Sequence, residues 1–425
     1  MSITKISKDN IKCKCAFCDD DEMSMIIDFG EVALAGAFLK SNQFENELLY
    51  PMRLFFCHNC YAVQIVDNVD ENVLFNDYFY FSSSIQTLCD HFNSYAVEVV
   101  EEFIVNRSKS TVIEFGCNDG VLLRPLADLN IGTLIGVDPA SNIINTINDS
   151  RINIVNDFFN ETTSGYIIKK YGKADMIIAN NVFAHIPDMK GVTKAIVNTL
   201  SDNGVFIFEV HYLGKIIEEL QYDMIYHEHL YYHSLISLQN HFNQYDMVIF
   251  NVKEISIHAG SMRFYVCKKG SKHATESINV VKLREEEIQR GFNIFDTFSR
   301  FSEDVNKQKN KLNQLLQNIK DKGQTIAGYG ASGRANTIIQ YCGIDHKLMD
   351  YIVDDAPAKI GFFTPGSHLE ILPSSALSGK NAPDYVLVFA WSFFDEILKR
   401  NKNYIDAGGY MILPLPTVKT YPDVK

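Results

Sequence analysis

Two pairs of cysteines near the start of the chain have the spacing of metal ligands. Cys15 and Cys18 are separated by two residues, and so are Cys57 and Cys60. Each pair can hold one side of an ion, and four thiolates in a tetrahedron suit zinc. Because such a site is closed, it leaves no open position for chemistry and instead holds together a segment too small to form its own core. We therefore predict a structural zinc ion on these cysteines, in preference to four free buried thiols.

Charge around this site and across the chain argues against nucleic-acid binding. Cys13 and His58 could compete as ligands, and three aspartates and a glutamate follow Cys18. A zinc ribbon that binds nucleic acid is usually basic around its ligands, and general nucleic-acid binders need a basic face. The net charge here is -13. We expect the zinc segment to be a scaffold, although local cations could still hold a small anionic ligand.

A glycine-rich turn further along the chain could bind a nucleoside. The run TVIEFGCNDGVLL has the pattern of a strand, a tight turn and the start of a helix, with Glu114, Gly116, Asn118 and Gly120 in the turn. A carboxylate comes first, which suits a ligand with a positive amino group and sulfonium but would repel a pyrophosphate. Taken alone, this turn could belong to any nucleotide-binding fold.

Polar residues at the ends of the next strands support the same ligand. Asp138 ends the following strand, placed to accept both hydroxyls of a ribose. Asp157 and Phe158 follow a third strand, where they could bracket an adenine, and Asn180 ends a fourth. Successive strand ends face one crevice in a doubly wound sheet. We therefore predict that these residues bind S-adenosylmethionine.

The apolar runs predict the elements that position these residues. TVIEFG, TLIGVD, INIVN, ADMIIAN and GVFIFEV alternate with helical stretches, which predicts a mainly parallel sheet covered on both faces. MVIFNVKEIS and SMRFYVCKK follow closely, so this sheet could end in an antiparallel pair. Residues 280–320 have helical spacing. After Gly323 the strand–turn–helix pattern restarts, with four strand-like runs, QTIAGYG, DYIVDD, DYVLVFA and GGYMILPLP.

We therefore expect an α/β protein of three parts. These are a small zinc-binding domain over 1–75, a doubly wound methyltransferase sheet over 76–270, and a helical connector with a second Rossmann-like domain over 271–425. A length of 425 residues agrees with two or three domains. The first residues lack the apolar stretch of a signal peptide, and no run approaches the roughly 20 apolar residues of a membrane helix. We expect a cytoplasmic monomer without membrane contact.

The motifs together resemble a known family. The order of the CxxC pairs, EFGCNDG, ANNVFAHIPD, FEVHYL and YHEHLYYHS is similar to the C-methyltransferases that act on nucleotide-linked keto-deoxysugars. The match covers nearly the whole chain, and YHEH is its most specific element. The resemblance implies methylation of carbon 3 of a thymidine-diphosphate 4-keto-deoxysugar or a relative, in deoxysugar or surface-polysaccharide biosynthesis. The partner would be that nucleotide-diphosphate keto-sugar.

The chemistry implied by this family needs a base. A proton next to a ketone is weakly acidic, so its removal requires a group with a pKa near neutrality and donors for the enolate oxygen. The resemblance implies that His229 is the base, with Glu228 or Tyr226 orienting it or holding the sugar ring. It also implies that His185 donates to the oxyanion and that the zinc-side segment brings Tyr80 to the site.

Two neighbouring histidines and one further run are interpreted separately from the YHEH base. His227 and His233 are interpreted as structural. The run HAGSMR, which ends in Arg263, is similar to one of the family except that Ala259 stands where glycine is usual. The resemblance implies a substrate contact by Arg263, and Ala259 is a departure from the family pattern where the backbone approaches the pocket.

A second glycine-rich turn leaves other activities open. GYGASG, which contains Gly330, follows a strand, and Asp354 and Asp355 end the next one. By itself this is a dinucleotide fingerprint, so an NAD-dependent oxidoreductase is an alternative. An O-methyltransferase and a non-catalytic zinc scaffold are two others. The resemblance implies instead that this turn, with Arg334, holds the diphosphate of the nucleotide sugar.

Overall fold

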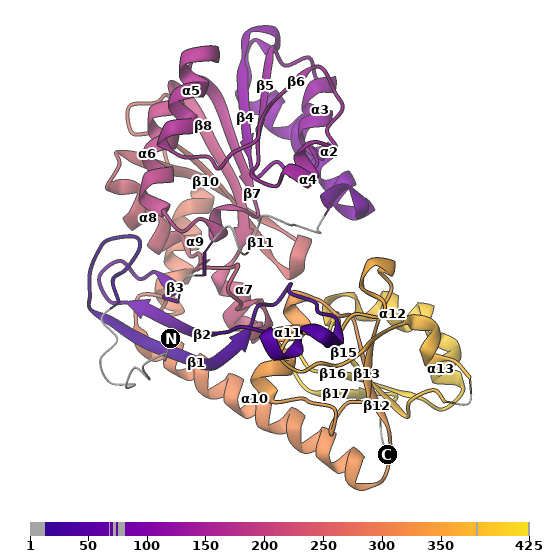
Figure 1. The fold of residues 1–425 in the computed structure, drawn as a ribbon. Coiled ribbons are helices and arrows are strands. Elements are labelled where there is room, and N and C mark those ends of the chain that lie inside the picture. Colours follow the sequence, from indigo (N-terminus) through magenta and orange to yellow (C-terminus); the bar gives the residue numbers. More distant parts are fainter. Residues whose placement is uncertain (1–12, 68, 71–73, 75–80, 380, 424–425) are drawn as a thin grey trace.

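The computed structural model describes residues 13–67, 69–70, 74, 81–379 and 381–423 (Figure 1). These residues form three β-sheets, with helices packed around the two larger ones. None of the helices described is both long and apolar enough to span a membrane. The architecture is α/β, as predicted: a small cysteine-bearing sheet, a doubly wound sheet and a second Rossmann-like sheet.

The small sheet is antiparallel and takes its last strand from the middle of the chain. Its order is β1 (Met23–Ala33), β2 (Leu49–Cys57), β3 (Val63–Ile65) and β9 (Tyr231–Tyr232). In β9, Tyr231 pairs with Gln64 and Tyr232 with Val63. The N-terminal segment is therefore joined by hydrogen bonds to the residues that directly follow the YHEH string.

The second sheet has seven strands and contains all of the runs predicted for it. Its order is β10 (Met247–Ile255), β11 (Ser261–Lys268), β8 (Leu200–His211), β7 (Ala174–Asn180), β4 (Thr111–Phe115), β5 (Thr133–Val137) and β6 (Ile152–Val155). The pairs from β8 to β6 are parallel. The last two strands along the chain, β10 and β11, form antiparallel pairs, β10 with β11 and β11 with β8. This confirms the antiparallel pair predicted for the end of the sheet.

Helices cover both faces of this sheet because its strands are apolar on both sides. One face packs against α5 (Glu161–Tyr171), α6 (Met189–Thr199), α8 (Leu235–Asn243) and α9 (Ile278–Gln289). The other packs against α2 (Gln86–Phe103), α3 (Leu123–Asp128) and α4 (Ser141–Ile144). Figure 1 shows the two groups on opposite sides of the strands. Burial on both faces is typical of parallel sheets.

The third sheet has six strands. Its order is β14 (Ile371–Pro373), β13 (Tyr351–Asp354), β12 (Ile326–Tyr329), β15 (Tyr385–Val388), β16 (Tyr410–Leu413) and β17 (Lys419–Tyr421). All pairs are parallel except the last. The sequence predicted the four inner strands but not β14 and β17, which are too short to show a pattern. The helices of this unit are α11 (Gly333–Cys342), α12 (Phe394–Arg400) and α13 (Lys402–Asp406).

The small sheet lies beside both of the larger units (Figure 1). Its strands β1 and β2 share one hydrophobic core with α7 (Leu213–Glu218), the long helix α10 (Phe295–Asp321) and the third sheet. The buried side chains of α10 recur every three to four residues, as the sequence predicted. The loops with the cysteines belong instead to a core of the second sheet, so the zinc segment contacts both α/β units.

Candidate active site and zinc site

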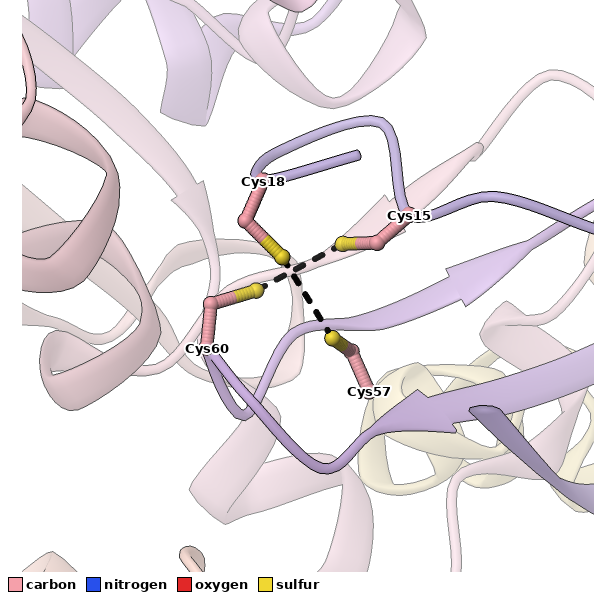
Figure 2. Close-up of side chains that lie close together, drawn as sticks. All are labelled: Cys15, Cys18, Cys57 and Cys60. Carbon is pink, nitrogen blue, oxygen red and sulfur yellow. Dashed lines mark hydrogen bonds between the residues drawn. The ribbon is translucent and has the colours of Figure 1, made fainter. Parts of the chain in front are cut away.

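The four predicted cysteines come together at one point (Figure 2). The sulfurs of Cys15 and Cys60 lie 3.4 Å apart and those of Cys18 and Cys57 3.6 Å apart, and all four lie within 4.8 Å of one another. Zinc–sulfur bonds of about 2.3 Å would place tetrahedral sulfurs about 3.8 Å apart. The cluster therefore fits a zinc ion.

Hydrogen bonds to sulfur orient the cluster. The backbone N–H of Phe17 donates to Cys15 Sγ at 3.4 Å, and the buried amide of Gln64 donates to the same sulfur at 3.1 Å. The two alternative ligands have other partners: Cys13 Sγ lies 3.9 Å from Met23 Sδ, and His58 Nε2 lies 2.8 Å from Ser24 Oγ.

The two loops that carry the cysteine pairs, residues 15–18 and 57–60, pack directly against the unit of the seven-stranded second sheet. The ring of Phe17 makes edge contacts with Tyr231 and His241, each with centroids 5.1 Å apart. Asn240 donates to the Cys60 carbonyl at 3.3 Å, and Gln244 to the Phe17 carbonyl at 3.4 Å. The zinc site therefore supports α8 and β9, the elements that follow the YHEH string.

A cavity of about 450 Å³ lies over the carboxyl ends of the parallel strands. It is lined by most of the residues predicted to bind S-adenosylmethionine: Glu114, Gly116, Asn118, Asp138, Asp157, Phe158 and Asn180. Gly120 shapes the turn instead, with a φ of +77°. At Gly116, which has a φ of +66°, a Cβ would lie 2.7 Å from the Val182 side chain. This position therefore requires glycine.

Some buried polar atoms at the base of this cavity are left without a hydrogen bond in the part of the chain that is described. Glu114 Oε2 and both amide atoms of Asn180 have no hydrogen-bond partner among the described residues. Burial raises the pKa of the Glu114 carboxyl. Buried polar groups are normally paired, so these atoms fit a ligand that brings donors and positive charge. S-adenosylmethionine has both.

The acidic groups at the next strand ends are held in place. Asp138 accepts from the backbone N–H groups of Asn118 and Ala140, both at 2.9 Å, through separate oxygens. Each oxygen keeps a lone pair that could accept a ribose hydroxyl. The carboxylate of Asp157 accepts from the N–H of Phe158 at 2.8 Å and from the Thr163 hydroxyl at 2.9 Å.

The YHEH string contributes three side chains to the same cavity: Tyr226, Glu228 and His229. Nδ1 of His229 lies 2.9 Å from the Met224 carbonyl oxygen, and Nε2 lies 2.9 Å from the Tyr226 hydroxyl. A carbonyl oxygen only accepts, so Nδ1 carries the hydrogen in the neutral ring. Nε2 then has the lone pair and accepts from Tyr226.

Two further groups have pKa values shifted by burial. His185 lies edge-on to His229, with ring centroids 4.9 Å apart. Burial lowers the pKa of His185 to about 4, so its imidazole is neutral at pH 7. Burial raises the pKa of Glu228 to about 7, so this carboxyl carries a proton for part of the time near neutrality. The protonated Glu228 carboxyl can donate a hydrogen bond into the cavity, whereas the one N–H of neutral His185 is engaged by the backbone of Asn181.

The structure also places the histidines interpreted as structural. Nε2 of His227 lies 3.1 Å from the Pro51 carbonyl oxygen, so this ring joins the YHEH string to β2. His233 is buried beside the rings of Phe17 and Phe183. Tyr80 lies outside the described residues. Ser82, two residues further on, lines the cavity, and its N–H donates to Asn118 Oδ1 at 3.0 Å.

Arg263 does not line the cavity in the part of the chain that is described. Its guanidinium is buried and pairs with Glu209 at 2.6 Å and Glu98 at 3.2 Å, while its carbon Cζ lies 3.5 Å above the Tyr95 ring. A buried guanidinium held by two carboxylates serves the core of the sheet. The structure therefore does not support a substrate contact for Arg263.

The second glycine turn brings one side chain to the cavity. Gly330 has a φ of +93° and shapes the turn, whereas Arg334 lines the cavity. Asp354 accepts from Lys359 Nζ at 3.1 Å and from the Ala356 N–H at 2.8 Å. Asp355 accepts from the Tyr329 hydroxyl at 2.8 Å.

His211 is a cavity residue that the sequence interpretation missed. It ends β8 and lines the cavity, with its ring centroid 5.5 Å from that of His229. The rule that polar residues at parallel strand ends face one crevice applies to it as it does to Asp138. Applied to the run FEVHYL, the same rule identifies His211 as a residue of the crevice.

Comparisons with known proteins agree with this geometry. Three family models match the chain: a zinc binding domain over residues 15–75, a methyltransferase domain over 89–251 and a C-methyltransferase C-terminal domain over 256–416. The chain is 28% identical over 404 residues to the C-methyltransferase NovU of Streptomyces niveus, which covers 95% of each chain.

Similar solved structures include two methyltransferases. One is a magnesium protoporphyrin IX methyltransferase from Synechocystis PCC 6803, 14% identical over 42% of this chain and 79% of that chain, with a TM-score of 0.32. The other is an S-adenosylmethionine-dependent methyltransferase from Clostridium acetobutylicum ATCC 824. It is 13% identical over 42% of this chain and 90% of that chain, with a TM-score of 0.33.

Proposed function

Because the chain combines the zinc-binding, methyltransferase and C-terminal domains of an S-adenosylmethionine-dependent C-methyltransferase, we propose that it methylates carbon 3 of a nucleotide-linked 4-keto-deoxysugar. One observation carries this proposal. The strand ends suited to the methyl donor and the hydrogen-bonded pair Tyr226–His229 line the same cavity. Similarity to a C-methyltransferase over 95% of the chain supports a carbon product.

The first step is removal of the proton on carbon 3. The lone pair on Nε2 of His229 faces the Tyr226 hydroxyl. The C–H bond therefore breaks toward the Tyr226 oxygen while the hydroxyl proton moves to Nε2. His229 becomes an imidazolium that keeps its Nδ1–H bond to the Met224 carbonyl, and the electron pair of the C–H bond becomes the enolate.

Donors in the cavity then stabilise the enolate oxygen. His185 is neutral because burial lowers its pKa to about 4, and its one N–H is engaged by the backbone of Asn181, so it holds the cavity wall and leaves the donation to Glu228. Glu228, with a pKa raised to about 7, can donate when it is protonated. Donors fixed before the reaction stabilise developing charge in a site that excludes water.

Methyl transfer completes the reaction. S-adenosylmethionine, when bound, supplies a methyl group on a positively charged sulfonium. Glu114 and Asn180 would hold its charged end, and Asp138 its ribose. As the carbon–carbon bond forms, the sulfur–carbon bond breaks and the enolate returns to a ketone. His229 then releases its extra proton to solvent.

Arg334 is proposed to bind the diphosphate of the nucleotide sugar. Its Nε donates to Asp223 Oδ2 at 2.8 Å, which fixes the guanidinium at the cavity wall. A guanidinium has five N–H donors, so others remain for a phosphate. The adjacent turn and the start of α11 can add backbone N–H groups.

The test uses a thymidine-diphosphate 4-keto-deoxysugar and S-adenosylmethionine with a 13C-labelled methyl group. Carbon NMR of the product should show a C–CH3 signal, and an O–CH3 signal would overturn the proposal in favour of an O-methyltransferase. In deuterated water, without the methyl donor, the sugar should exchange its carbon-3 proton. Oxygen methylation needs no such exchange, so the two measurements are independent.

An NAD-dependent oxidoreductase is the second candidate, on the strength of the GYGASG turn. The carboxylate of Asp354, which would accept ribose hydroxyls in that case, is bonded to Lys359, and Lys359 also donates to the Ala331 carbonyl at 2.6 Å. A carboxylate already paired with a cation does not favour a dinucleotide. This supports the sugar-nucleotide assignment of the turn.

A further inference from the structure

The loop that carries the base, residues 222–229 and here called the base loop, lies against α11 of the third sheet's domain. Tyr222 Oη lies 3.4 Å from Cys342 Sγ at the end of α11. A Cβ on Gly333, at the start of α11, would lie 3.8 Å from the Tyr226 ring. The base loop therefore follows α11 along its length, although it belongs to the second sheet's unit.

Two polar contacts fasten the base loop to this domain. The hydroxyl of Thr337 donates to the Ile225 carbonyl at 2.9 Å, and both residues are buried. Asp223, which has no solvent exposure, accepts through Oδ2 from Arg334 Nε at 2.8 Å and from Trp391 Nε1 at 2.9 Å. The three donors, Thr337, Arg334 and Trp391, all lie in the domain of the third sheet, which is the C-terminal domain.

These contacts fall on either side of Met224. The Met224 carbonyl accepts from Nδ1 of His229 at 2.9 Å and so sets which ring nitrogen is protonated. The Met224 carbonyl shares one planar peptide with the Ile225 N–H, which donates to the Tyr222 carbonyl at 3.1 Å. The Asp223 side chain and the Ile225 carbonyl, on either side of this peptide, hold the turn against the C-terminal domain. The direction of the Met224 carbonyl thus depends on this turn and on the contacts of Asp223 and Thr337 that hold it in place.

We propose that the C-terminal domain holds His229 in its basic tautomer, and that Thr337 is a positioning residue that acts through the Ile225 and Met224 peptides. Without this restraint the Met224 carbonyl could turn away from Nδ1. The ring could then carry its hydrogen on Nε2, which would leave no lone pair toward Tyr226. The domain would therefore support deprotonation as well as substrate binding. The kinetic consequence rests on the proposed function.

Thr337→Val tests the proposal because it removes the hydroxyl and keeps the branched shape. We expect it to lower kcat and the carbon-3 exchange rate about tenfold. The KM for the thymidine-diphosphate 4-keto-deoxysugar and the Kd for S-adenosylmethionine should stay within about twofold, because Thr337 touches neither ligand in the proposal. Thr337→Ser, which restores the hydroxyl, should recover most of the lost rate.

Thr199→Val is the matched control. Thr199 is also buried and its hydroxyl also donates to a backbone carbonyl, that of Ala195 at 2.6 Å in α6. It loses a similar hydrogen bond away from the base loop, so its kcat should match the wild-type value. Equal losses of kcat in both variants would mean that general destabilisation explains the effect, and would overturn the proposal.

A second readout does not depend on catalysis. In protein labelled with 15N-histidine, the His229 resonances, assigned by their loss in His229→Asn, should be those of the Nδ1–H tautomer. Thr337→Val should shift them toward the Nε2–H form and Thr337→Ser should not. An unchanged tautomer in Thr337→Val would overturn the proposal. Wild-type protein with the expected tautomer but no exchange of any nucleotide keto-sugar would instead count against the proposed function.

Discussion

The hydroxyl oxygen of Tyr226 lies 2.9 Å from Nε2 of His229, the ring nitrogen that carries the lone pair. The other ring nitrogen is bonded to the Met224 carbonyl. His229, the proposed base, therefore lines the cavity together with a tyrosine three residues before it. His229 can take the proton from carbon 3 directly or through the Tyr226 hydroxyl. The two routes predict different effects of Tyr226→Phe on proton exchange.

Tyr226→Phe should lose carbon-3 proton exchange by about a hundredfold or more, as should His229→Asn, because each removes one member of the relay. Both variants should bind S-adenosylmethionine with wild-type Kd. Exchange followed by proton NMR in deuterated water measures the first effect and calorimetry the second. Tyr171→Phe is the control, since its hydroxyl bonds to Asn153 at 3.2 Å outside the cavity. Wild-type exchange in Tyr226→Phe would show that His229 acts directly.

The pH dependence of kcat should report on Glu228. Burial raises the pKa of this carboxyl to about 7, so its proton is present below that pH and lost above it. If the protonated carboxyl donates to the enolate, kcat should fall as pH rises through about 7. Glu228→Gln keeps a donor at every pH, so this fall should disappear in the variant. If kcat falls with rising pH in the same way in wild type and in Glu228→Gln, another group is responsible for the titration.

The strand-end and cysteine residues could be predicted because their signals are local. A CxxC pair brings two ligands to one ion from a single turn of chain, and parallel strands end at a common edge whatever lies between them. Cys15, Asp138 and Asn180 were found in this way. The same locality made the four inner strands of the third sheet visible.

The contacts that escaped prediction join residues distant in the sequence. Arg263 looked like a substrate contact, but it pairs with Glu209 and Glu98, 54 and 165 residues away. No local pattern marks a charge that is neutralised in the core. The strand β9 and the bond from Thr337 to Ile225 likewise depend on how separate units dock. Periodicity within one segment carries no information about that docking.

The zinc site should affect folding before it affects chemistry. Purified protein should contain one zinc per chain by metal analysis. Cys57→Ser should lower the thermal midpoint by at least about 5 °C, because a structural metal contributes its binding energy to the folded state. Cys89→Ser, a half-buried cysteine outside the cluster, should leave zinc content and midpoint unchanged. Fully folded wild-type protein without metal would contradict the assignment.

Acid should destabilise the protein through a buried histidine of α8. His241 is fully buried, and burial lowers its pKa to about 4. Its pKa in the unfolded chain is about 6.5, so the unfolded state takes up the proton first as pH falls. The full contribution of His241 to stability is therefore present above about pH 6.5 and is lost between there and about pH 4, by on the order of 3 kcal/mol.

His241→Phe should remove this contribution. Thr193 then keeps its bond to the Met189 carbonyl at 2.7 Å, so no hydroxyl is left unpaired. Urea unfolding at pH 5 and pH 7.5 would give the stability difference for each protein. The variant should show a smaller difference than wild type, whereas the exposed His346→Gln should match wild type. A pH dependence unchanged by His241→Phe would assign the acid sensitivity to other groups.

Binding measurements should assign the second glycine turn to the nucleotide sugar. Arg334 lines the cavity and is already oriented by Asp223, whereas the Asp354 carboxylate is paired with Lys359. Calorimetry should therefore show binding of a thymidine-diphosphate sugar and no competition by NAD or NADH.

Arg334→Lys keeps the charge but loses the forked geometry that matches phosphate. It should weaken sugar-nucleotide binding about tenfold, since a charge-assisted hydrogen bond contributes ~1.5 kcal/mol or more. S-adenosylmethionine binding should not change. Tight binding of NADH that displaces the sugar nucleotide would instead make the turn a redox-cofactor site, since both ligands would then compete for one set of backbone N–H groups.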